Sequence, residues 1–258
     1  RVSLTTEALH APAKLPFSVI DEQAGEAMRG EIECARLAAD SIGGAVECAA
    51  IGLPVGLGDH PFEGVEGRMA AILYSIPAVK AVAFGDGFDF VRGYGSTHND
   101  AYVMQEDGHV ATKTNHCGGI VGGMTTGMPL LFSVAFKPTP SIGSAQASIS
   151  LSSKENVTMT IKGRHDPCIV PRAVPVVEAA AAIAIFDLIL GNTRTEFQKS
   201  DESVMFIGLH AAVDKIGIIG ADGRAGHVLQ AADRDIADQL LAADNHARDD
   251  VAVAVEIL

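Results

Sequence analysis

The densest group of reactive side chains lies between Gly163 and Cys168, where the chain reads Gly-Arg-His-Asp-Pro-Cys. Arg164 carries a planar fork of donors that suits phosphate or carboxylate, and His165 and Asp166 beside it could move protons. Arg172 follows, ahead of an apolar stretch, and two prolines stiffen the loop in between. These residue types predict a binding site for an anionic ligand. A surface ion pair in a tight turn is the alternative interpretation.

Two further segments could contact a ligand. Residues 137–141 read Lys-Pro-Thr-Pro-Ser, and each proline favours extended backbone at the residue before it, which leaves the lysine and the hydroxyls free. Residues 115–123 read Asn-His-Cys-Gly-Gly-Ile-Val-Gly-Gly, and paired glycines let a flat ligand approach the backbone. A rigid strand exit and an ordinary glycine turn are the alternatives. The spacing of the cysteines and histidines matches no zinc site, so we expect no metal.

The distribution of charge supports an anion site. The chain has a net charge of −13, but residues 137–172 carry +3, so the remaining residues carry −16. A positive region on an acidic protein is where a small anion would bind. The acidic balance argues against nucleic-acid binding, which requires a basic surface. The four cysteines are scattered without a CxxC pair, which is typical of reduced thiols in the cytoplasm.

No stretch of the sequence predicts a membrane span or a signal peptide. The most apolar stretch, residues 174–190, contains Glu178 and Asp187, which indicates a buried helix. No basic stretch precedes an apolar run at the start. The chain begins at Arg1 and not at a methionine, which we interpret as a fragment or a processed product.

Strands and helices are expected in runs without strict alternation, which predicts an α+β fold with antiparallel sheets. Asp21 is the expected N-cap of the first helix, and Pro175 and Gly191 are expected to open and close the last. The expected helices are residues 21–39, 65–75 and 175–190, and the expected strands are residues 44–51, 79–84, 130–136, 145–151 and 157–162. Residues 192–258 hold six basic and twelve acidic side chains and no proline, so we divide the chain into a core, 1–191, and a tail, 192–258.

Six segments, taken in order, resemble the chorismate synthase family. They are residues 40–47, 52–58, 75–88, 115–123, 136–141 and 162–178. The resemblance covers roughly residues 17–191. It implies a β-α-β sandwich of antiparallel sheets and a cytoplasmic homotetramer.

The resemblance implies conversion of 5-enolpyruvylshikimate 3-phosphate to chorismate by anti-1,4-elimination of phosphate. The family reaction needs reduced FMN although it has no net redox change, and NADPH would be needed only if the chain reduces its own flavin. Such a site must hold anions and a planar ring and must exclude water and oxygen.

The family's roles transfer to matching positions of this sequence. Asp166 would handle a proton, and Arg172 would face the substrate. The flavin contacts implied are Pro77, Ala78, Gly122, Lys137, Pro138, Thr139, Pro140, Ser141 and Arg164.

Several family segments have no counterpart in this sequence. The GESHG, RPGHAD and GRxSxRE segments, which would supply two histidines and most substrate-binding arginines, are not found. His98 and His116 do not lie in such motifs. In the tail, residues 229–241 resemble the first helix of a chorismate mutase. Three hypotheses stay open: the lyase, a non-catalytic or flavin-binding relative, and a bifunctional chain with mutase activity.

Overall fold

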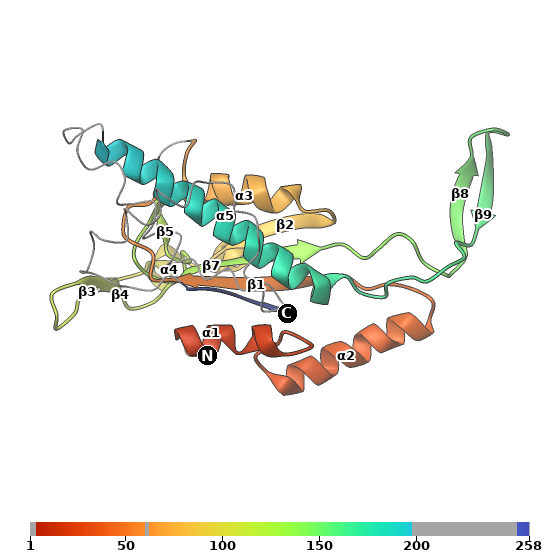
Figure 1. The fold of residues 1–258 in the computed structure, drawn as a ribbon, viewed down its shortest axis with the longest axis horizontal. Helices are drawn as coiled ribbons and strands as arrows, with labels where there is room; N and C mark the ends of the chain where they lie inside the picture. The colour runs from red at the N-terminus through yellow and green to blue at the C-terminus, as the bar shows by residue number, and fades with distance from the viewer. Residues whose placement is uncertain (1–3, 60–61, 198–251, 258) are drawn as a thin grey trace, which may run out of the picture.

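The computed structural model describes residues 4–59, 62–197 and 252–257. Their centre is a four-stranded sheet of β1 (Gly44–Ile51), β2 (Val79–Phe84), β7 (Leu130–Phe136) and β10 (Ala252–Ile257). The strand order is β10-β1-β7-β2 and every neighbouring pair is antiparallel (Figure 1). Gly44 on β1 pairs with Phe136 on β7, so the start of β1 meets the end of β7.

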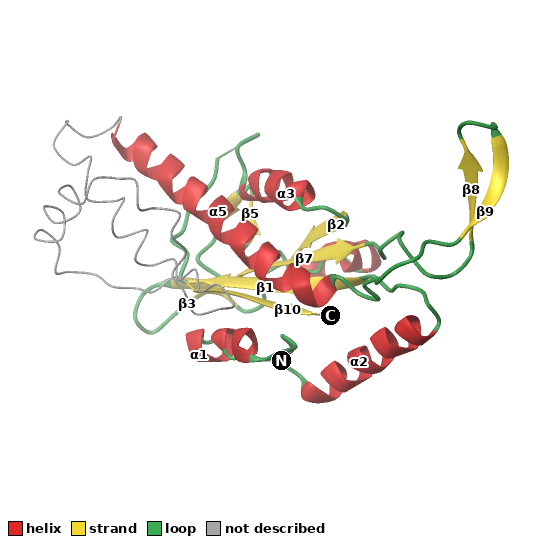
Figure 2. Ribbon diagram, turned by 45° about the vertical axis from the view of Figure 1, so that its right-hand side comes forward, coloured by secondary structure: helices red, strands yellow, loops and turns green. Residues whose placement is uncertain are grey.

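Two helices cover one face of this sheet. They are α3 (Val65–Ser75) and α5 (Val170–Phe197), which crosses the sheet diagonally (Figures 1 and 2). Side chains of β7 alternate strictly between buried and half-buried, as expected for a strand with one face in the core. Those of the core face are Leu130, Phe132, Val134 and Phe136.

The buried residues of α5 recur at intervals of three and four, which produces one apolar stripe along the helix. They include Val170, Ala173, Val174, Val177, Ala181, Ala184, Ile185 and Leu188. Many are alanines, so the helix axis lies close to the sheet. Arg68 of α3 also pairs with Asp187 of α5 at 2.7 Å, which links the two helices at the surface.

The expected bounds of α5 were wrong at both ends. The helix begins at Val170, five residues before Pro175, and continues past Gly191 to Phe197. Proline is tolerated near the start of a helix because the first N–H groups have no intrahelical partner. Pro175 lies in the second turn of α5, where it removes only one backbone hydrogen bond. A glycine inside a helix costs only about 1 kcal/mol relative to alanine, which is not enough by itself to end a helix at Gly191.

Three helical segments from the start of the chain lie on the other side of the sheet. α1 (Thr6–His10) and η1 (Pro12–Lys14) lie against β10, and α2 (Glu22–Leu37) runs outward from them (Figure 1). Asp21 caps α2 as expected, because its Oδ1 accepts from the Ala24 amide at 3.0 Å.

The remaining elements are small. The hairpin of β8 (Gln146–Ser150) and β9 (Glu155–Met159) extends away from the body of the molecule, and its second strand begins two residues earlier than expected (Figure 2). The others are η2 (Gly87–Arg92), α4 (Gly95–His98), β3 (Tyr102–Met104), β4 (Val110–Thr112), β5 (Ile120–Val121) and β6 (Met124–Thr125).

The predicted α+β class with antiparallel sheets is confirmed. The described residues supply one sheet and the helical layer of the expected sandwich. α5 continues six residues past residue 191, and β10 pairs with β1, while residues 198–251 lie outside the described part of the chain. The division at residue 191 therefore stays a prediction, and the mutase-like segment lies outside the described residues.

Within the described residues, one helix is long and apolar enough to cross a membrane, namely Val170–Asn192 of α5. Half of its most apolar window is buried inside the protein, against the sheet and α3. A core helix of a folded domain has the same length and composition, so this property does not place the chain in a membrane.

Candidate functional site

Three loops meet where β1 begins and β7 ends. The Ser41 hydroxyl donates to the Thr139 carbonyl at 2.7 Å, and the Thr139 hydroxyl donates to the Asp166 carbonyl at 3.0 Å. The Ile42 amide donates to the Pro167 carbonyl at 2.8 Å. Residues 41–42, 137–141 and 164–168, which are far apart in the sequence, are therefore fixed against one another.

The predicted residues Pro77 and Ala78 join the same group. The Lys137 amide donates to the Ala78 carbonyl at 2.9 Å, which places the turn between α3 and β2 beside the lysine. Ala78 has a φ of 74°, a left-handed conformation that is uncommon for alanine. The ladder between β2 and β7 shifts register at Lys80, which marks a bulge in the adjacent strand. Both irregularities lie next to the predicted flavin contacts.

Gly43 lets the first and second loops approach closely. A Cβ added at Gly43 would lie 2.4 Å from the Phe136 carbonyl oxygen and 3.0 Å from Cδ of Pro138. The backbone before β1 therefore passes directly over the start of the proline loop, and only glycine fits there.

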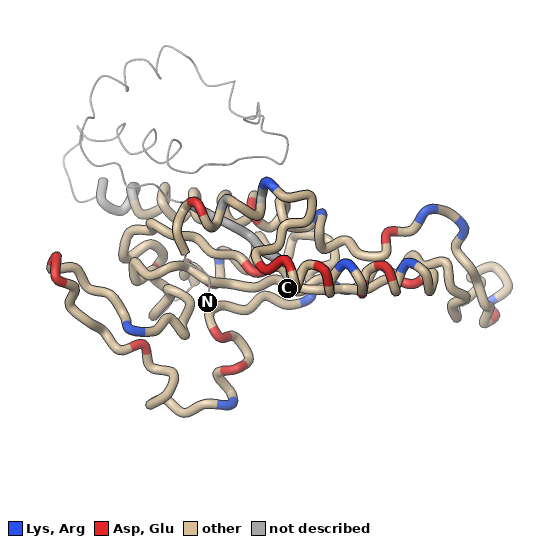
Figure 3. Tube along the Cα trace, turned by 90° about the horizontal axis from the view of Figure 1, so that it is seen from below, with Lys and Arg blue, Asp and Glu red and all other residues tan. Residues whose placement is uncertain are grey.

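The cations of the site are exposed and face solvent. Lys137, Arg164 and Arg172 are all exposed, whereas Asp166 is half-buried and forms an ion pair with Arg172. Figure 3 marks these basic residues along the backbone. An exposed set of cations can hold a phosphate or a carboxylate.

Gly122 does not join this group within the chain. Gly122 lies in the turn between β5 and β6. The carbonyl of Gly118, just before β5, accepts from the Leu131 amide at the start of β7. The Gly123 carbonyl accepts from Val65, the first residue of α3, whereas Ala78 follows the end of that helix. The seven residues of β7 therefore separate the glycine turn, at the start of the strand, from the loop junction at its end by about 20 Å. Gly122 was grouped with the other flavin contacts by the family resemblance alone, without a geometric reason.

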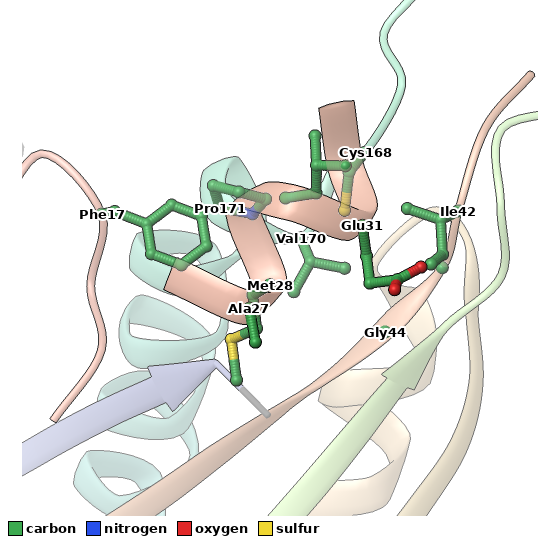
Figure 4. A pocket seen from close by; sticks show the side chains of 11 residues that line it. Phe17, Ala27, Met28, Glu31, Ile42, Gly44, Cys168, Val170 and Pro171 are labelled. Carbon is green, nitrogen blue, oxygen red and sulfur yellow. The ribbon is translucent and has the colours of Figure 1, made fainter. Parts of the chain in front are cut away.

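Two cavities lie near the sheet, and neither is lined by the predicted flavin contacts. The smaller, about 260 Å³, lies between α2 and the start of α5 directly behind the three loops (Figure 4). Its lining is apolar apart from Glu31 and includes Ile42, Gly43 and Cys168. The larger, about 770 Å³, is lined by residues of β1, β7 and the loops around Asp86 and His116.

A cluster of titratable residues borders the larger cavity. His116 Nδ1 lies 2.5 Å from Asp86 Oδ2, and His98 Nε2 lies 3.9 Å from the same oxygen. Sequence reasoning missed this cluster, although Asp86 and His116 lie in two of the six segments that carry the family resemblance, residues 75–88 and 115–123. Among residues 4–59, 62–197 and 252–257, no group of three or more His, Cys, Asp or Glu side chains could hold a metal ion.

Asp100 holds the loop of that cluster in place. Its carboxylate accepts from the amides of His116 and Cys117 and from the Thr114 hydroxyl. Burial raises the pKa of Asp100, but these hydrogen bonds together lower it more, so the pKa lies below its ordinary value. Asp100 therefore stays ionised and acts as a structural acceptor.

The family profile described as "Chorismate synthase" matches residues 2–190. The chain belongs to the chorismate synthase family. It is 51% identical over 176 residues to a chorismate synthase of Thermococcus kodakarensis, covering 68% of this chain and 49% of that relative. It is 48% identical over 170 residues to one from Dehalococcoides mccartyi, covering 66% of this chain and 46% of the relative. The chain thus spans about half the length of the curated chorismate synthases it matches.

The fold is also that of a solved chorismate synthase. A crystal structure with that name superposes with a TM-score of 0.56 and 24% identity, covering 81% of this chain and 56% of the other. At this identity the match concerns the fold alone. Membership of the chorismate synthase family identifies the chain as a relative of lyases, and it confirms the resemblance drawn from the six segments.

Proposed function

We propose that this chain forms part of the active site of a chorismate synthase, which converts 5-enolpyruvylshikimate 3-phosphate to chorismate and phosphate with reduced FMN. The observation that carries the proposal is the junction of the three loops. Segments with the family's residues at positions 77–78, 137–141 and 164–172 meet at one end of the sheet, through hydrogen bonds of 2.7–3.0 Å.

The residues at this junction fit a phosphorylated flavin. Exposed Lys137 and Arg164 offer charge-assisted donors to a phosphate. Thr139 and Ser141 lie in the same loop as Lys137, and the Thr139 hydroxyl fixes that loop by donating to the Asp166 carbonyl. Two exposed prolines give a rigid surface on which a flat ring can lie. When bound, reduced FMN would lend electron density as the phosphate leaves and take it back afterwards.

The protein's own residues would then hold the anions and one proton. Arg172 would attract the anionic substrate while it keeps Asp166 oriented through Oδ2. That leaves Oδ1 of Asp166 as the atom that can accept a proton. Gly122 would contact the flavin only if another part of the assembly brings it to the junction, because it lies at the opposite end of β7 in this chain.

An anaerobic assay tests the proposal. The chain is mixed with 5-enolpyruvylshikimate 3-phosphate and dithionite-reduced FMN, and phosphate release and flavin binding are both measured. Release of phosphate together with chorismate supports the lyase. Flavin binding without release favours the non-catalytic relative. Absence of both rejects the proposal. Prephenate formed from added chorismate would indicate mutase activity.

We further propose that the protein is a cytoplasmic homotetramer with no nucleic-acid or membrane partner, and that NADPH is needed only if the chain reduces its own flavin. Light scattering at several concentrations should give the mass of four chains. Flavin reduction by NADPH without dithionite would show that the protein reduces its own cofactor.

A further inference from the structure

His165 lies in the loop between β9 and α5, and its ring is held from one side. Its Nε2 atom lies 2.9 Å from the carbonyl oxygen of Ile161. A carbonyl oxygen can only accept, so Nε2 must carry the hydrogen. A neutral imidazole has a single N–H group, which leaves Nδ1 as a bare acceptor.

The bare nitrogen faces Ser141, the last residue of the proline loop. His165 Nδ1 lies 3.5 Å from the Ser141 hydroxyl oxygen, which is longer than an ordinary hydrogen bond of about 2.5–3.2 Å. Such contacts are often long before a ligand binds. Since Nδ1 can only accept, the single hydrogen of the hydroxyl points toward His165. The lone pairs of the exposed Ser141 oxygen then point away from the ring, toward solvent.

The backbone around this pair is fixed independently of it. Thr139, two residues before Ser141, donates to the Asp166 carbonyl, one residue after His165. On the other side of the ring, a Cβ added at Gly143 would lie 3.6 Å from His165 Cδ2, in van der Waals contact. The distance between the serine and the imidazole is therefore set by the loop junction and not by the pair alone.

We propose that His165 is a positioning residue that makes the Ser141 hydroxyl a hydrogen-bond acceptor for an N–H group of the ligand. The ligand class is a heterocycle that presents N–H at its edge. The identification of that heterocycle as the flavin ring rests on the proposed function. Reduction of a flavin adds N–H groups to the ring, so the oriented serine favours the reduced form.

The orientation of the imidazole can be measured without any ligand. Two-dimensional ¹⁵N–¹H spectra of histidine side chains distinguish the two neutral tautomers at alkaline pH. We expect the Nε2–H tautomer for His165, and a shift of its Nδ1 signal in Ser141→Ala. An Nδ1–H tautomer, or an Nδ1 signal unchanged by Ser141→Ala, would overturn the inference.

Two substitutions of His165 distinguish the roles of its two ring nitrogens. Asparagine retains an acceptor near the position of Nδ1, whereas glutamine retains a donor near Nε2. Titrations with oxidised and reduced FMN should show that His165→Gln and Ser141→Ala weaken binding of reduced FMN about three- to tenfold, the loss of one neutral hydrogen bond. The same two variants should lose less affinity for oxidised FMN. His165→Asn should bind reduced FMN nearly as well as the wild type.

The control is His109→Gln, which changes an exposed histidine on the loop between β3 and β4. The inference fails if His165→Asn loses as much affinity for reduced FMN as His165→Gln does. It also fails if the variants weaken binding of oxidised and reduced FMN equally. If the wild-type chain binds neither form of FMN, the proposed function fails, and the spectra alone decide the inference about His165.

Discussion

Asp166 and Arg172, six residues apart, form an ion pair that holds the half-buried carboxylate of Asp166 where the three loops meet. Asp166 was predicted from the sequence to handle a proton and Arg172 to face an anionic substrate, and both lie at the loop junction. The hydroxyl contacts of Ser41 and Thr139 could not be predicted in the same way, because each joins backbone segments that are more than 25 residues apart. The pairing of Asp86 with His116, 30 residues further along the chain, was missed for the same reason.

At the residue scale, Lys137→Ala and Arg164→Ala should each weaken flavin binding. Loss of one charge-assisted contact should cost about 1.5–3 kcal/mol. Flavin titration measures the effect, and Lys113→Ala, an exposed lysine outside the loop junction, is the matched control. Unchanged binding in both variants would contradict the assignment of these residues.

Glu178 should make stability depend on pH. Burial raises its pKa from 4.5 to about 7, so the folded chain takes up a proton between these values that the unfolded chain does not. The stability of the wild type should therefore fall as pH rises from about 4.5 to 7 and stay level above that. Glu178→Gln should remove the dependence and be more stable at pH 8 by about 1–2 kcal/mol, a value reduced for partial solvent exposure. Urea denaturation at pH 5 and 8 measures the difference, and an equal effect at both values would contradict it.

The cysteines should differ strongly in reactivity. Cys34 is exposed on α2, whereas Cys48 is buried under α5. Burial, with a smaller contribution from the charge of Glu178, raises the pKa of the Cys48 thiol well above its ordinary value. Burial also raises the pKa values of Cys117 and Cys168. One fast phase with a thiol reagent at pH 8 is expected, and Cys34→Ser should abolish it. A fast phase that persists in this variant would be inconsistent with the burial described.

At the element scale, the periodicity of apolar residues located those strands and helices that bury one face and expose the other. The bounds of β1, α3, β2 and β7 were confirmed. The start of α5 was wrong because Pro175 was taken as an opening residue, although three apolar residues of the preceding turn are buried against the sheet. The position of Gly122 could not be predicted because hydrogen bonds between distant segments hold the glycine loop beside the start of β7, whereas the other predicted flavin contacts lie at its end.

Gly43→Ala tests the close approach of the loop before β1. The added Cβ would contact the Phe136 carbonyl at 2.4 Å, so the variant should lose about 2 kcal/mol or more and bind flavin less well. Gly30→Ala is the matched control, because Gly30 is exposed in α2 and a Cβ there meets nothing within 4 Å. The control should gain about 0.5–1 kcal/mol. Chemical denaturation of both variants measures the contrast, and a stable Gly43→Ala protein would refute the packing described.

At the scale of the whole molecule, the described residues form a packed layer of sheet and helices and an arm that extends away from it. The arm is the β8–β9 hairpin, whose residues are half-buried or exposed, including Leu151 at 83%. A two-stranded hairpin alone is only marginally stable in water. The antiparallel class could be predicted from alternation, but the direction of the arm could not, because it depends on loops without periodicity.

The arm should be cut early by proteases. Lys154 lies in the exposed turn of the hairpin, whereas Lys80 lies in β2 within the sheet. Limited trypsin digestion followed by mass spectrometry should detect cleavage after Lys154 well before cleavage after Lys80. Lys154→Gln should remove the early product. Earlier cleavage after Lys80 would show that the sheet opens more readily than the arm.

The pairing of β1 with β7 has a consequence for how the protein is made. Residue 44 pairs with residue 136, so β1 has no neighbour on that side until about 90 more residues have been synthesised. At about 5–20 residues per second this takes roughly 5–20 s. Throughout that interval the nascent chain carries the apolar strand Val46 to Ile51 with an open edge. A growing chain in this state is a natural substrate for chaperones, and slower translation between β1 and β7 should increase its aggregation.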